Sequence, residues 1–222
     1  MEDGKKMINI IYEDNHLLVV EKPVNMSTQL DSSKDLDLLS YLKQYLKEKY
    51  NKPGNVYLGL VHRLDRTVGG IMVFAKTSKC ASRLNEQIRN NLFKKTYYAV
   101  ICGNLVNNGS FIDYLKKDEK RNISYISDKG KYSELSYEVL KHKENKTLVK
   151  INLVTGRSHQ IRVQFSSRGY PLYGDKKYNM KSLPQEQIAL FAKELEFIHP
   201  ITKESIKFTL KLPNTYPWNL FN

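Results

Sequence analysis

Cysteine is scarce in this sequence, and long apolar runs are missing. The 222 residues include two cysteines, Cys80 and Cys102, which stand apart without a CxxC pair or a Cys/His cluster. We interpret both as reduced, packed thiols rather than as disulfide, zinc or catalytic groups. No apolar segment approaches the ~18 residues that a membrane-spanning helix needs. The chain is long enough to bury roughly 70% of its unfolded surface, so we expect it to fold without a disulfide or a metal.

Targeting signals and ligand-binding motifs are missing as well. Residues 1–7 have neither the apolar core of a signal peptide nor an Arg- and Ser-rich presequence, so we expect a cytoplasmic protein. The five histidines lack metal-ligand spacing, and Gly69-Gly70 lacks the lysine of a phosphate-binding loop. We therefore expect no cofactor, no metal and no membrane partner, and we expect a monomer.

Acidic residues are outnumbered by basic ones. The sequence has 36 Lys and Arg residues against 23 Asp and Glu residues, a formal net charge of +13. Such a charge favours binding to a polyanion, which leaves RNA, DNA and anionic membranes as candidate partners. A host that favours lysine, asparagine, isoleucine and tyrosine would produce the same charge without any partner. The charge alone therefore does not identify the function.

Helical periodicity is confined to three segments. Leucines at helical spacing predict a helix that ends before the turn residues 51–54: Leu38, Leu39, Leu42 and Leu46. A second helix is expected to begin at the N-cap Ser78. Three apolar residues would lie on one face of it: Ala81, Leu84 and Ile88. A short third helix would be capped by Ser158 and end near Gly169, with Arg162 one turn inside it.

Strands account for most of the remaining apolar pattern. They are predicted at 8–12, 17–20, 56–61, 71–75, 96–102, 148–154 and 206–212, with a hairpin over 124–140 turned at 128–130. Asx residues between the first two runs predict an opening hairpin. Because strands outnumber helices and do not alternate with them, we expect an α+β domain with a mixed, mostly antiparallel sheet and flanking helices. We find no internal repeat or linker and expect a single domain over residues 1–222.

The stretch from Gly59 to Arg66 is the most informative segment. It reads Gly-Leu-Val-His-Arg-Leu-Asp-Arg, so that a carboxylate, Asp65, lies between two arginines directly after an apolar strand-like run. A nearby cation keeps a buried carboxylate ionised, and only the anion can attack carbon. Asp65 is therefore a candidate nucleophile. The same residues would also suit a solvated ion pair worth about 0 to 1 kcal/mol, and this segment alone does not decide.

Further motifs surround this segment in a fixed order. Glu21-Lys22-Pro23 precedes it, and four motifs follow: Lys95-Thr96-Tyr97, Thr155-Gly156-Arg157-Ser158-His159-Gln160-Ile161-Arg162-Val163, Pro171-Leu172-Tyr173-Gly174-Asp175 and Phe197-Ile198-His199-Pro200. Several ordered motifs are far more specific than any one of them. With this set the chain resembles the RluA-type RNA pseudouridine synthases over nearly its whole length.

The resemblance implies the pseudouridine synthase fold with a central catalytic cleft across the sheet. It implies an isomerase that breaks the glycosidic bond of a uridine in tRNA or ribosomal RNA, rotates the uracil and rejoins it to the sugar through carbon. The reacting atoms lie within the base stack, so the nucleotide must be flipped into a pocket at a cost of about a few kcal/mol. The chain starts almost directly at the catalytic domain, so we expect no separate N-terminal RNA-binding module.

Three catalytic residues are implied by the same resemblance. Asp65 corresponds to the essential aspartate, which attacks the anomeric carbon or assists proton removal from the sugar. Arg162 corresponds to the arginine that pairs with this aspartate, although an arginine here would also suit a phosphate contact. Tyr97 corresponds to a tyrosine that stacks on the flipped base, although a tyrosine packed in a sheet would look the same.

RNA-binding residues are implied at five further positions: His62, Arg63, Arg66, Arg157 and Ile161. Arg63 corresponds to a residue that fills the gap left by the flipped base, and a simple phosphate contact is the alternative. Ile161 is expected to form an apolar wall of the pocket.

Four positions depart from the usual family pattern: Asn25, Val68, Gly69 and Gln164. None of these departures removes a catalytic group. Because of them, the family pattern does not determine the conformation of the loop after Asp65 or the RNA specificity. Two rival functions fit the residues less well. A non-catalytic RNA-binding factor would need only basic residues, and a nucleic-acid hydrolase would use Asp65 as a base with a metal cluster or second carboxylate that the motifs lack.

Overall fold

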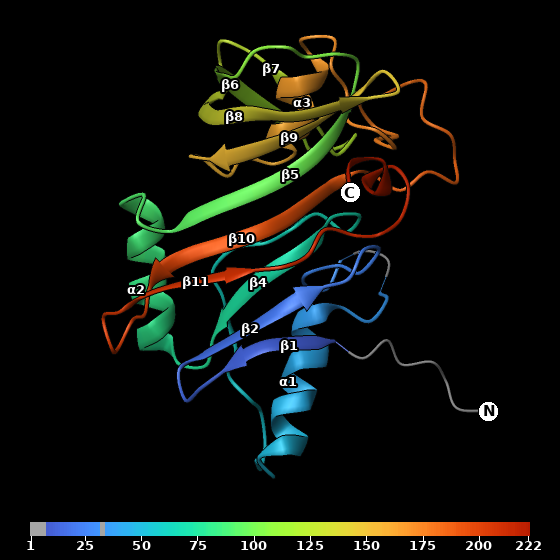
Figure 1. Cartoon of the computed structure of the whole chain (residues 1–222). Helices are drawn as coiled ribbons and strands as arrows, with labels where there is room; N and C mark the ends of the chain where they lie inside the picture. Colours follow the sequence, from blue (N-terminus) through green and yellow to red (C-terminus); the bar gives the residue numbers. More distant parts are fainter. Residues whose placement is uncertain (1–7, 32–33) are drawn as a thin grey trace, which may run out of the picture. The chain divides into compact units, whose positions relative to one another are not determined.

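The computed structural model describes residues 8–31 and 34–222, which form two compact units (Figure 1). The first unit takes in the chain up to Phe93 together with Leu195–Leu210, and the second comprises Lys94–Glu194 and Lys211–Asn222. Residues 1–7, where the sequence shows no targeting signal, lie outside the described residues. No helix in the described part of the chain is both long and apolar enough to cross a membrane.

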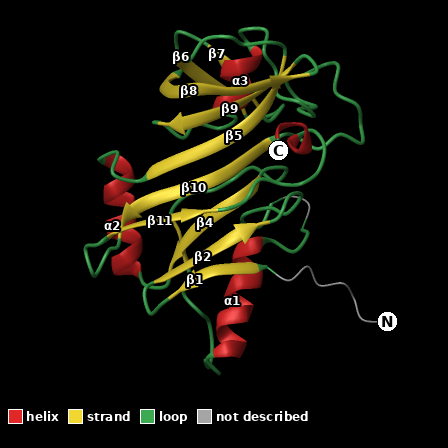
Figure 2. Ribbon diagram, viewed as in Figure 1, coloured by secondary structure: helices red, strands yellow, loops and turns green. Residues whose placement is uncertain are grey.

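The strands of the first unit form one sheet, in which the pairs β1–β2, β2–β4 and β3–β4 are antiparallel (Figure 2). Its strands are β1 (Asn9–Glu13), β2 (Leu17–Lys22), β3 (Gly59–Leu60), β4 (Gly69–Ala75), β11 (Ser205–Thr209) and the C-terminal part of β10 (Leu190–Ile198). Their order is β1-β2-β4-β10, with β3 beside β4 and β11 beside β10. The predicted opening hairpin is confirmed, whereas the predicted strand over 56–61 is reduced to the two residues of β3. Val56 and Leu58 are buried without joining the sheet, which explains the apolar pattern there.

Side-chain caps fix where the two helices of this unit begin. α1 (Leu38–Lys49) follows Asp37, whose carboxylate accepts the N–H of Ser40 at 3.0 Å. α2 (Ser78–Arg89) is capped by Thr77, whose hydroxyl accepts the N–H of Cys80 at 3.2 Å, so the predicted cap at Ser78 is wrong by one residue. Both caps satisfy N–H groups that a helix leaves open at its start.

The faces of α1 and α2 follow the predicted periodicity in part. α1 buries Leu38, Leu42 and Leu46 as expected, whereas Leu39 is only half-buried. α2 buries Leu84 together with Cys80, while Ala81 and Ile88 are only partly buried at the edge of the core.

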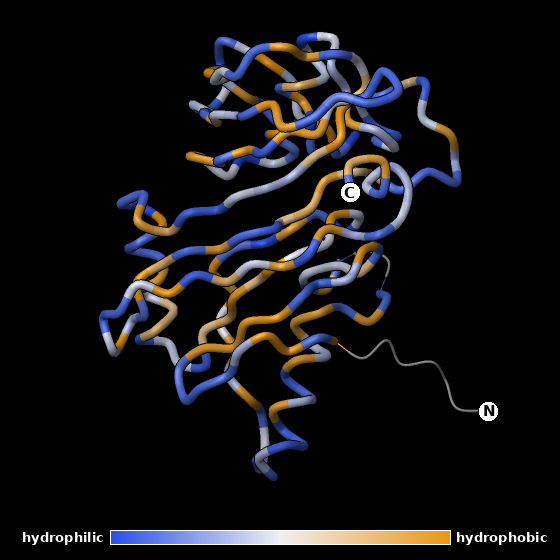
Figure 3. The backbone as a smooth tube through the Cα atoms, in the orientation of Figure 1, coloured by the Kyte–Doolittle hydropathy of each residue, from blue (hydrophilic) through white to orange (hydrophobic). Residues whose placement is uncertain are grey.

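The apolar core of the first unit lies on both faces of β2 and β4. One face packs against α2 and includes Leu17, Val19, Ile71 and Val73. The alternating residues of the other face are also fully buried: Leu18, Val20, Met72 and Phe74. Strands covered on both faces have continuous apolar runs, which appear as long orange stretches in Figure 3.

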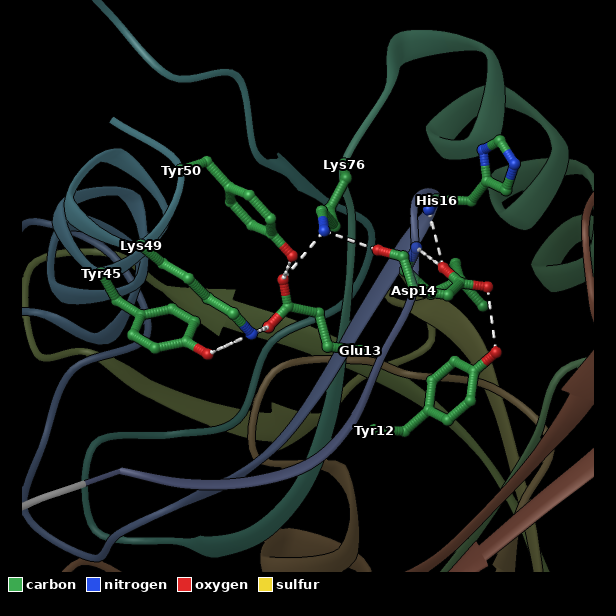
Figure 4. Close-up of polar contacts among 9 residues, drawn as sticks. Tyr12, Glu13, Asp14, His16, Tyr45, Lys49, Tyr50 and Lys76 are labelled. Atoms are coloured by element: carbon green, nitrogen blue, oxygen red, sulfur yellow. Dashed lines mark hydrogen bonds and ion pairs between the residues drawn. The ribbon is translucent and has the colours of Figure 1, made fainter. Parts of the chain in front are cut away.

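Figure 4 shows a polar cluster that ties the β1–β2 turn to α1 and β4. Glu13 Oε2 accepts from Lys49 at 2.8 Å and from Tyr45 at 3.0 Å, and Oε1 accepts from Lys76 at 2.9 Å and from Tyr50 at 2.7 Å. Burial raises the pKa of Glu13, but these four donors together lower it more, to about 2. Glu13 is therefore ionised and fastens the end of α1 to the sheet.

A second set of strands forms the other unit. They are β5 (Lys94–Cys102), β6 (Gly109–Asp118), β7 (Ile123–Ile126), β8 (Lys131–Lys143), β9 (Lys146–Leu153) and the N-terminal part of β10. Their order is β10-β5-β9-β8-β6-β7. The predicted strands over 96–102 and 148–154 correspond to β5 and β9.

The predicted hairpin over 124–140 is wrong. β7 and β8 are joined by the turn at 127–130, but both pair with β6 instead of with each other. Leu115 of β6 lies opposite Ile126 of β7 and opposite Lys131 of β8. Gly130 sits so close to the backbone of Leu115 that a Cβ atom would overlap it, which accounts for the glycine.

α3 (Gln160–Ser166) covers one face of this second sheet. The ring of Phe165 meets Phe111 of β6 at 5.0 Å and Tyr137 of β8 at 5.4 Å between centroids. The predicted cap at Ser158 is wrong, because the helix begins after His159, which has a left-handed φ of 54° and forms no side-chain cap. A short 3-10 helix, η1 (Trp218–Phe221), ends the chain.

Candidate active site

Asp65 lies in the loop of the first unit between β3 and β4. Thr28 Oγ1 donates to the carbonyl of Leu64 at 2.8 Å and accepts the Leu64 N–H at 3.3 Å. The carbonyl of Asp65 accepts the N–H of Val68 at 3.0 Å and closes a turn. Leu64 and Val68 are buried, whereas Asp65 is half-buried. The loop thus presents a carboxylate from a backbone that is fixed on both sides.

Lys22 supports the same loop from the interior. Its side chain is fully buried, and its ammonium donates to the carbonyls of Pro23 at 2.9 Å, Met26 at 2.6 Å and Arg66 at 3.1 Å. Burial lowers the pKa of Lys22 to about 7, the charge of Asp65 opposes this shift, and Arg66 adds to it. Lys22 therefore holds the backbone of the residue that follows Asp65, and its amino group lies close enough to the Asp65 carboxylate for their charges to interact.

The two arginines that flank Asp65 are exposed. Arg66 forms ion pairs with Asp35 and, at 3.9 Å, with Asp31. The hydrogen bond to Asp35 raises the pKa of Arg66 further. The predicted contacts of Arg63 and Arg66 with RNA stay predictions.

His62 faces the interior of the first unit. Its Nε2 accepts the N–H of Val73 at 3.1 Å, and its ring meets Phe93 edge-on at 5.4 Å. These contacts tie the start of the Asp65 loop to β4. A role for His62 in RNA binding also stays a prediction.

Tyr97 lies near the start of β5 in the second unit and is buried. It lies opposite Ile151 of β9, which lies opposite Tyr137 of β8, so these three side chains share one face of the sheet. Tyr137 contacts Phe165 of α3, so this is the face that α3 covers. Lys95 shares this face, and burial lowers the pKa of its ammonium.

Arg162 projects from α3 and is buried. Its Nε donates to Asp175 Oδ2 at 2.8 Å and its Nη2 donates to Asp175 Oδ1 at 2.7 Å. The ring of Tyr178 lies 5.2 Å from the Arg162 Cζ atom, in a cation–π contact. Ile161, the preceding residue, is buried as well. Tyr97 and the helix that carries Arg162 thus lie on the same face of this unit.

The loop before α3 carries Arg157, which is exposed. Its Nε donates to the carbonyl of Tyr132 at 2.9 Å. Its backbone N–H donates to Gln160 Oε1 at 3.0 Å, and the same oxygen accepts from Thr155 Oγ1 at 2.7 Å. The side chain of Gln160 therefore shapes the loop that leads into α3.

Two departures from the family pattern have a structural explanation. Asn25 has a left-handed φ of 63°, a conformation that glycine adopts freely and asparagine tolerates. Gln164 is fully buried, and its Nε2 donates to Asp113 Oδ2 at 2.7 Å and to the carbonyl of Phe111 at 3.3 Å. The glutamine therefore binds α3 to β6.

Lys22 and Asp175 lie within the ordered motifs, but the sequence alone predicts no role for either. A lysine is normally expected at the surface, and an aspartate 13 residues from Arg162 has no periodic relation to it. Their places in ordered motifs were the only signal.

Comparison with known proteins identifies the family. A family model described as RNA pseudouridylate synthase matches residues 16–167. The ribosomal large subunit pseudouridine synthase C of Buchnera aphidicola is 33% identical over 96% of this chain and 70% of that protein. The ribosomal large subunit pseudouridine synthase D of Pseudomonas aeruginosa is 32% identical over 96% of this chain and 71% of that protein.

A solved structure supports the fold independently. The structure of human RNA pseudouridylate synthase domain containing 4 matches with a TM-score of 0.77 at 23% identity, over 92% of this chain and 88% of that one. The chain therefore belongs to the RluA-type family of RNA pseudouridine synthases, which are isomerases that act on RNA.

Proposed function

We propose that the protein converts one or more uridines of large-subunit ribosomal RNA to pseudouridine in the cytoplasm, by base flipping and an aspartate-dependent rearrangement. The observation that carries this proposal is the family match over residues 16–167, which includes Asp65, Tyr97 and Arg162. The names of the bacterial relatives support ribosomal RNA over tRNA as the substrate class.

In this proposal Asp65 begins the reaction, either by attack on the anomeric carbon or by assisting removal of a proton from the sugar. The bond from uracil N1 to the sugar breaks, the base turns, and a bond from C5 to the sugar forms. The C5 proton is then lost, and N1 gains a proton, so the product has the mass of the substrate. Arg162 orients Asp65, and Tyr97 stacks on the flipped base.

Charge supports an RNA substrate. The second unit contains 20 of the 36 Lys and Arg residues and 10 of the 23 Asp and Glu residues, which gives it +10 of the net charge of +13. The first unit carries the other +3, because its 13 acidic residues offset most of its 16 basic ones. Concentrated positive charge favours association with a phosphate backbone.

Mapping of pseudouridine in RNA tests the proposal. Ribosomal and transfer RNA from cells with and without the gene are compared site by site, and the deletion strain is complemented with the wild type. We expect at least one site in large-subunit ribosomal RNA to be lost and restored. Loss of tRNA sites alone would contradict the substrate class, and unchanged sites in both RNAs would contradict the function.

A further inference from the structure

Asp175 and Arg162 form a pair with fixed geometry inside the second unit. Two nitrogens of the guanidinium, Nε and Nη2, each donate to a different oxygen of the carboxylate, at 2.8 and 2.7 Å. A bidentate pair of this kind fixes the plane and the rotation of the guanidinium, which a single hydrogen bond does not do. The Asp175 side chain is fully buried, and that of Arg162 is 7% exposed, so water does not compete strongly for either partner.

The carboxylate of Asp175 is itself held by the backbone. Its Oδ1 accepts the N–H of Lys177 at 3.1 Å and that of Tyr178 at 3.3 Å. The preceding residue, Gly174, has a left-handed φ of 68°, and a Cβ atom there would overlap the carbonyl oxygen of Gln187. The loop therefore requires glycine directly before Asp175, and it fixes the carboxylate independently of Arg162.

Tyr178 completes the support of Arg162. Its ring contacts the guanidinium, and its hydroxyl accepts the N–H of Ser124 at 2.6 Å and lies 2.8 Å from His159 Nδ1. A buried ion pair contributes little net stability compared with apolar residues of similar size. A need to orient the arginine explains the pair better than a need for stability does.

We propose that Asp175 is the positioning residue for Arg162: it fixes the plane and the rotation of the guanidinium that the proposed function assigns to catalysis. This inference rests on the proposed function. Because the Asp175 side chain is fully buried, it acts through Arg162 rather than on the substrate. It acts by removing the rotational freedom of Arg162 before RNA binds.

The test uses Asp175→Asn in the full chain. The asparagine oxygen still accepts the N–H groups of Lys177 and Tyr178, so the turn is kept, but its amide nitrogen faces the Arg162 Nε donor. Tritium release from large-subunit ribosomal RNA transcribed with uridine labelled at C5 measures turnover. We expect kcat to fall about 100-fold, as for a small misplacement of a catalytic group, with KM nearly unchanged.

A matched control lies just past the C-terminal end of α3. There Asp113 accepts two hydrogen bonds from Arg168, from Nη1 at 3.0 Å and from Nη2 at 3.1 Å, so Asp113→Asn breaks a second bidentate pair in the same unit. We expect this variant to keep a kcat close to that of the wild type. An equal loss of kcat in both variants, or no loss in Asp175→Asn, would overturn the inference.

NMR separates this inference from the proposed function. The NMR signal of the Arg162 Nε–H proton is assigned by its absence in Arg162→Lys. This proton should exchange slowly with solvent in the wild type and in Asp113→Asn, and rapidly in Asp175→Asn. Slow exchange in Asp175→Asn would overturn the positioning role. A wild type that releases no tritium from any RNA would contradict the proposed function, whereas the exchange rates would still show whether Asp175 holds Arg162.

Discussion

Replacement of the buried Lys22 by methionine should remove a pH dependence of stability that the wild type has. Burial lowers the pKa of Lys22 from its usual 10.5 to about 7. Between these values the unfolded chain binds the proton and the folded chain does not, so the unfolding free energy of the wild type rises with pH. The rise is ~1.4 kcal/mol per pH unit, and the whole shift corresponds to ~5 kcal/mol. Lys22→Met removes this rise.

Below pH 7 the wild type and Lys22→Met should differ less in unfolding free energy. The buried ammonium destabilises the wild type there, whereas methionine leaves the carbonyls of Pro23, Met26 and Arg66 without a donor, at ~1 to 3 kcal/mol for each buried acceptor. These two effects oppose each other.

Urea unfolding followed by circular dichroism at pH 6, 7.5 and 9 measures the difference between Lys22→Met and the wild type. Lys79→Met, which removes an exposed lysine from the first turn of α2, controls for the loss of one charge. We expect the difference for Lys22→Met to grow with pH and that for Lys79→Met to stay constant. A constant difference for Lys22→Met would refute the reasoning, because it would mean that the ammonium is well solvated in the folded protein.

Three further predictions concern stability and RNA binding. Glu13→Gln should destabilise the protein by ~1 to 3 kcal/mol at neutral pH, because four donors lose a charged acceptor. The stabilisation by ionised Glu13 is present above pH 4.5 and is lost as the pH falls toward 2, so the difference between variant and wild type in thermal unfolding should shrink in acid. Arg63→Ala should slow the single-turnover reaction on a stem-embedded uridine more than on the same uridine in an unstructured oligomer, because only the uridine in the stem must be unstacked. Equal losses of rate on the two substrates would indicate a phosphate contact. RNA affinity should fall with salt with a log-log slope near −0.7 per phosphate contacted on single strands, and a flat dependence would mean that the charge of +13 reflects composition bias.

Local patterns predicted the parts of the fold that depend on nearby residues. The hairpin of β1 and β2 follows from apolar runs around Asp14, whose Oδ1 accepts the N–H groups of His16 and Leu17 at 2.7 and 2.6 Å. The buried face of α1 follows from its leucine spacing. Each of these features is determined within a few residues of the chain.

Features that depend on distant residues were not predictable in this way. The pairing of β7 and β8 with β6 depends on a strand over 109–118 that the pattern did not reveal. The start of α3 depends on the left-handed His159 and on the side chain of Gln160, neither of which is a common helix cap. Burial of Lys22 depends on three carbonyl groups, one of them 44 residues away.

For the site, the motifs identified the residues, and the structure supplied contacts for them within each unit. Asp65, Tyr97 and Arg162 were predicted from the resemblance alone, and their catalytic roles stay predictions. The pairing of Arg162 with Asp175 was not predictable, because nothing in the spacing of 13 residues brings the two together without the turn at Gly174.

Turnover by Asp65→Asn tests the central claim most directly. Wild type and variant are compared for tritium release from large-subunit ribosomal RNA labelled at uracil C5, and for binding of the same RNA. We predict that the variant loses turnover by ~10² or more and binds RNA nearly as well as the wild type, because binding depends on cations and not on this carboxylate. Turnover by Asp65→Asn within about a factor of two of the wild type would contradict the account.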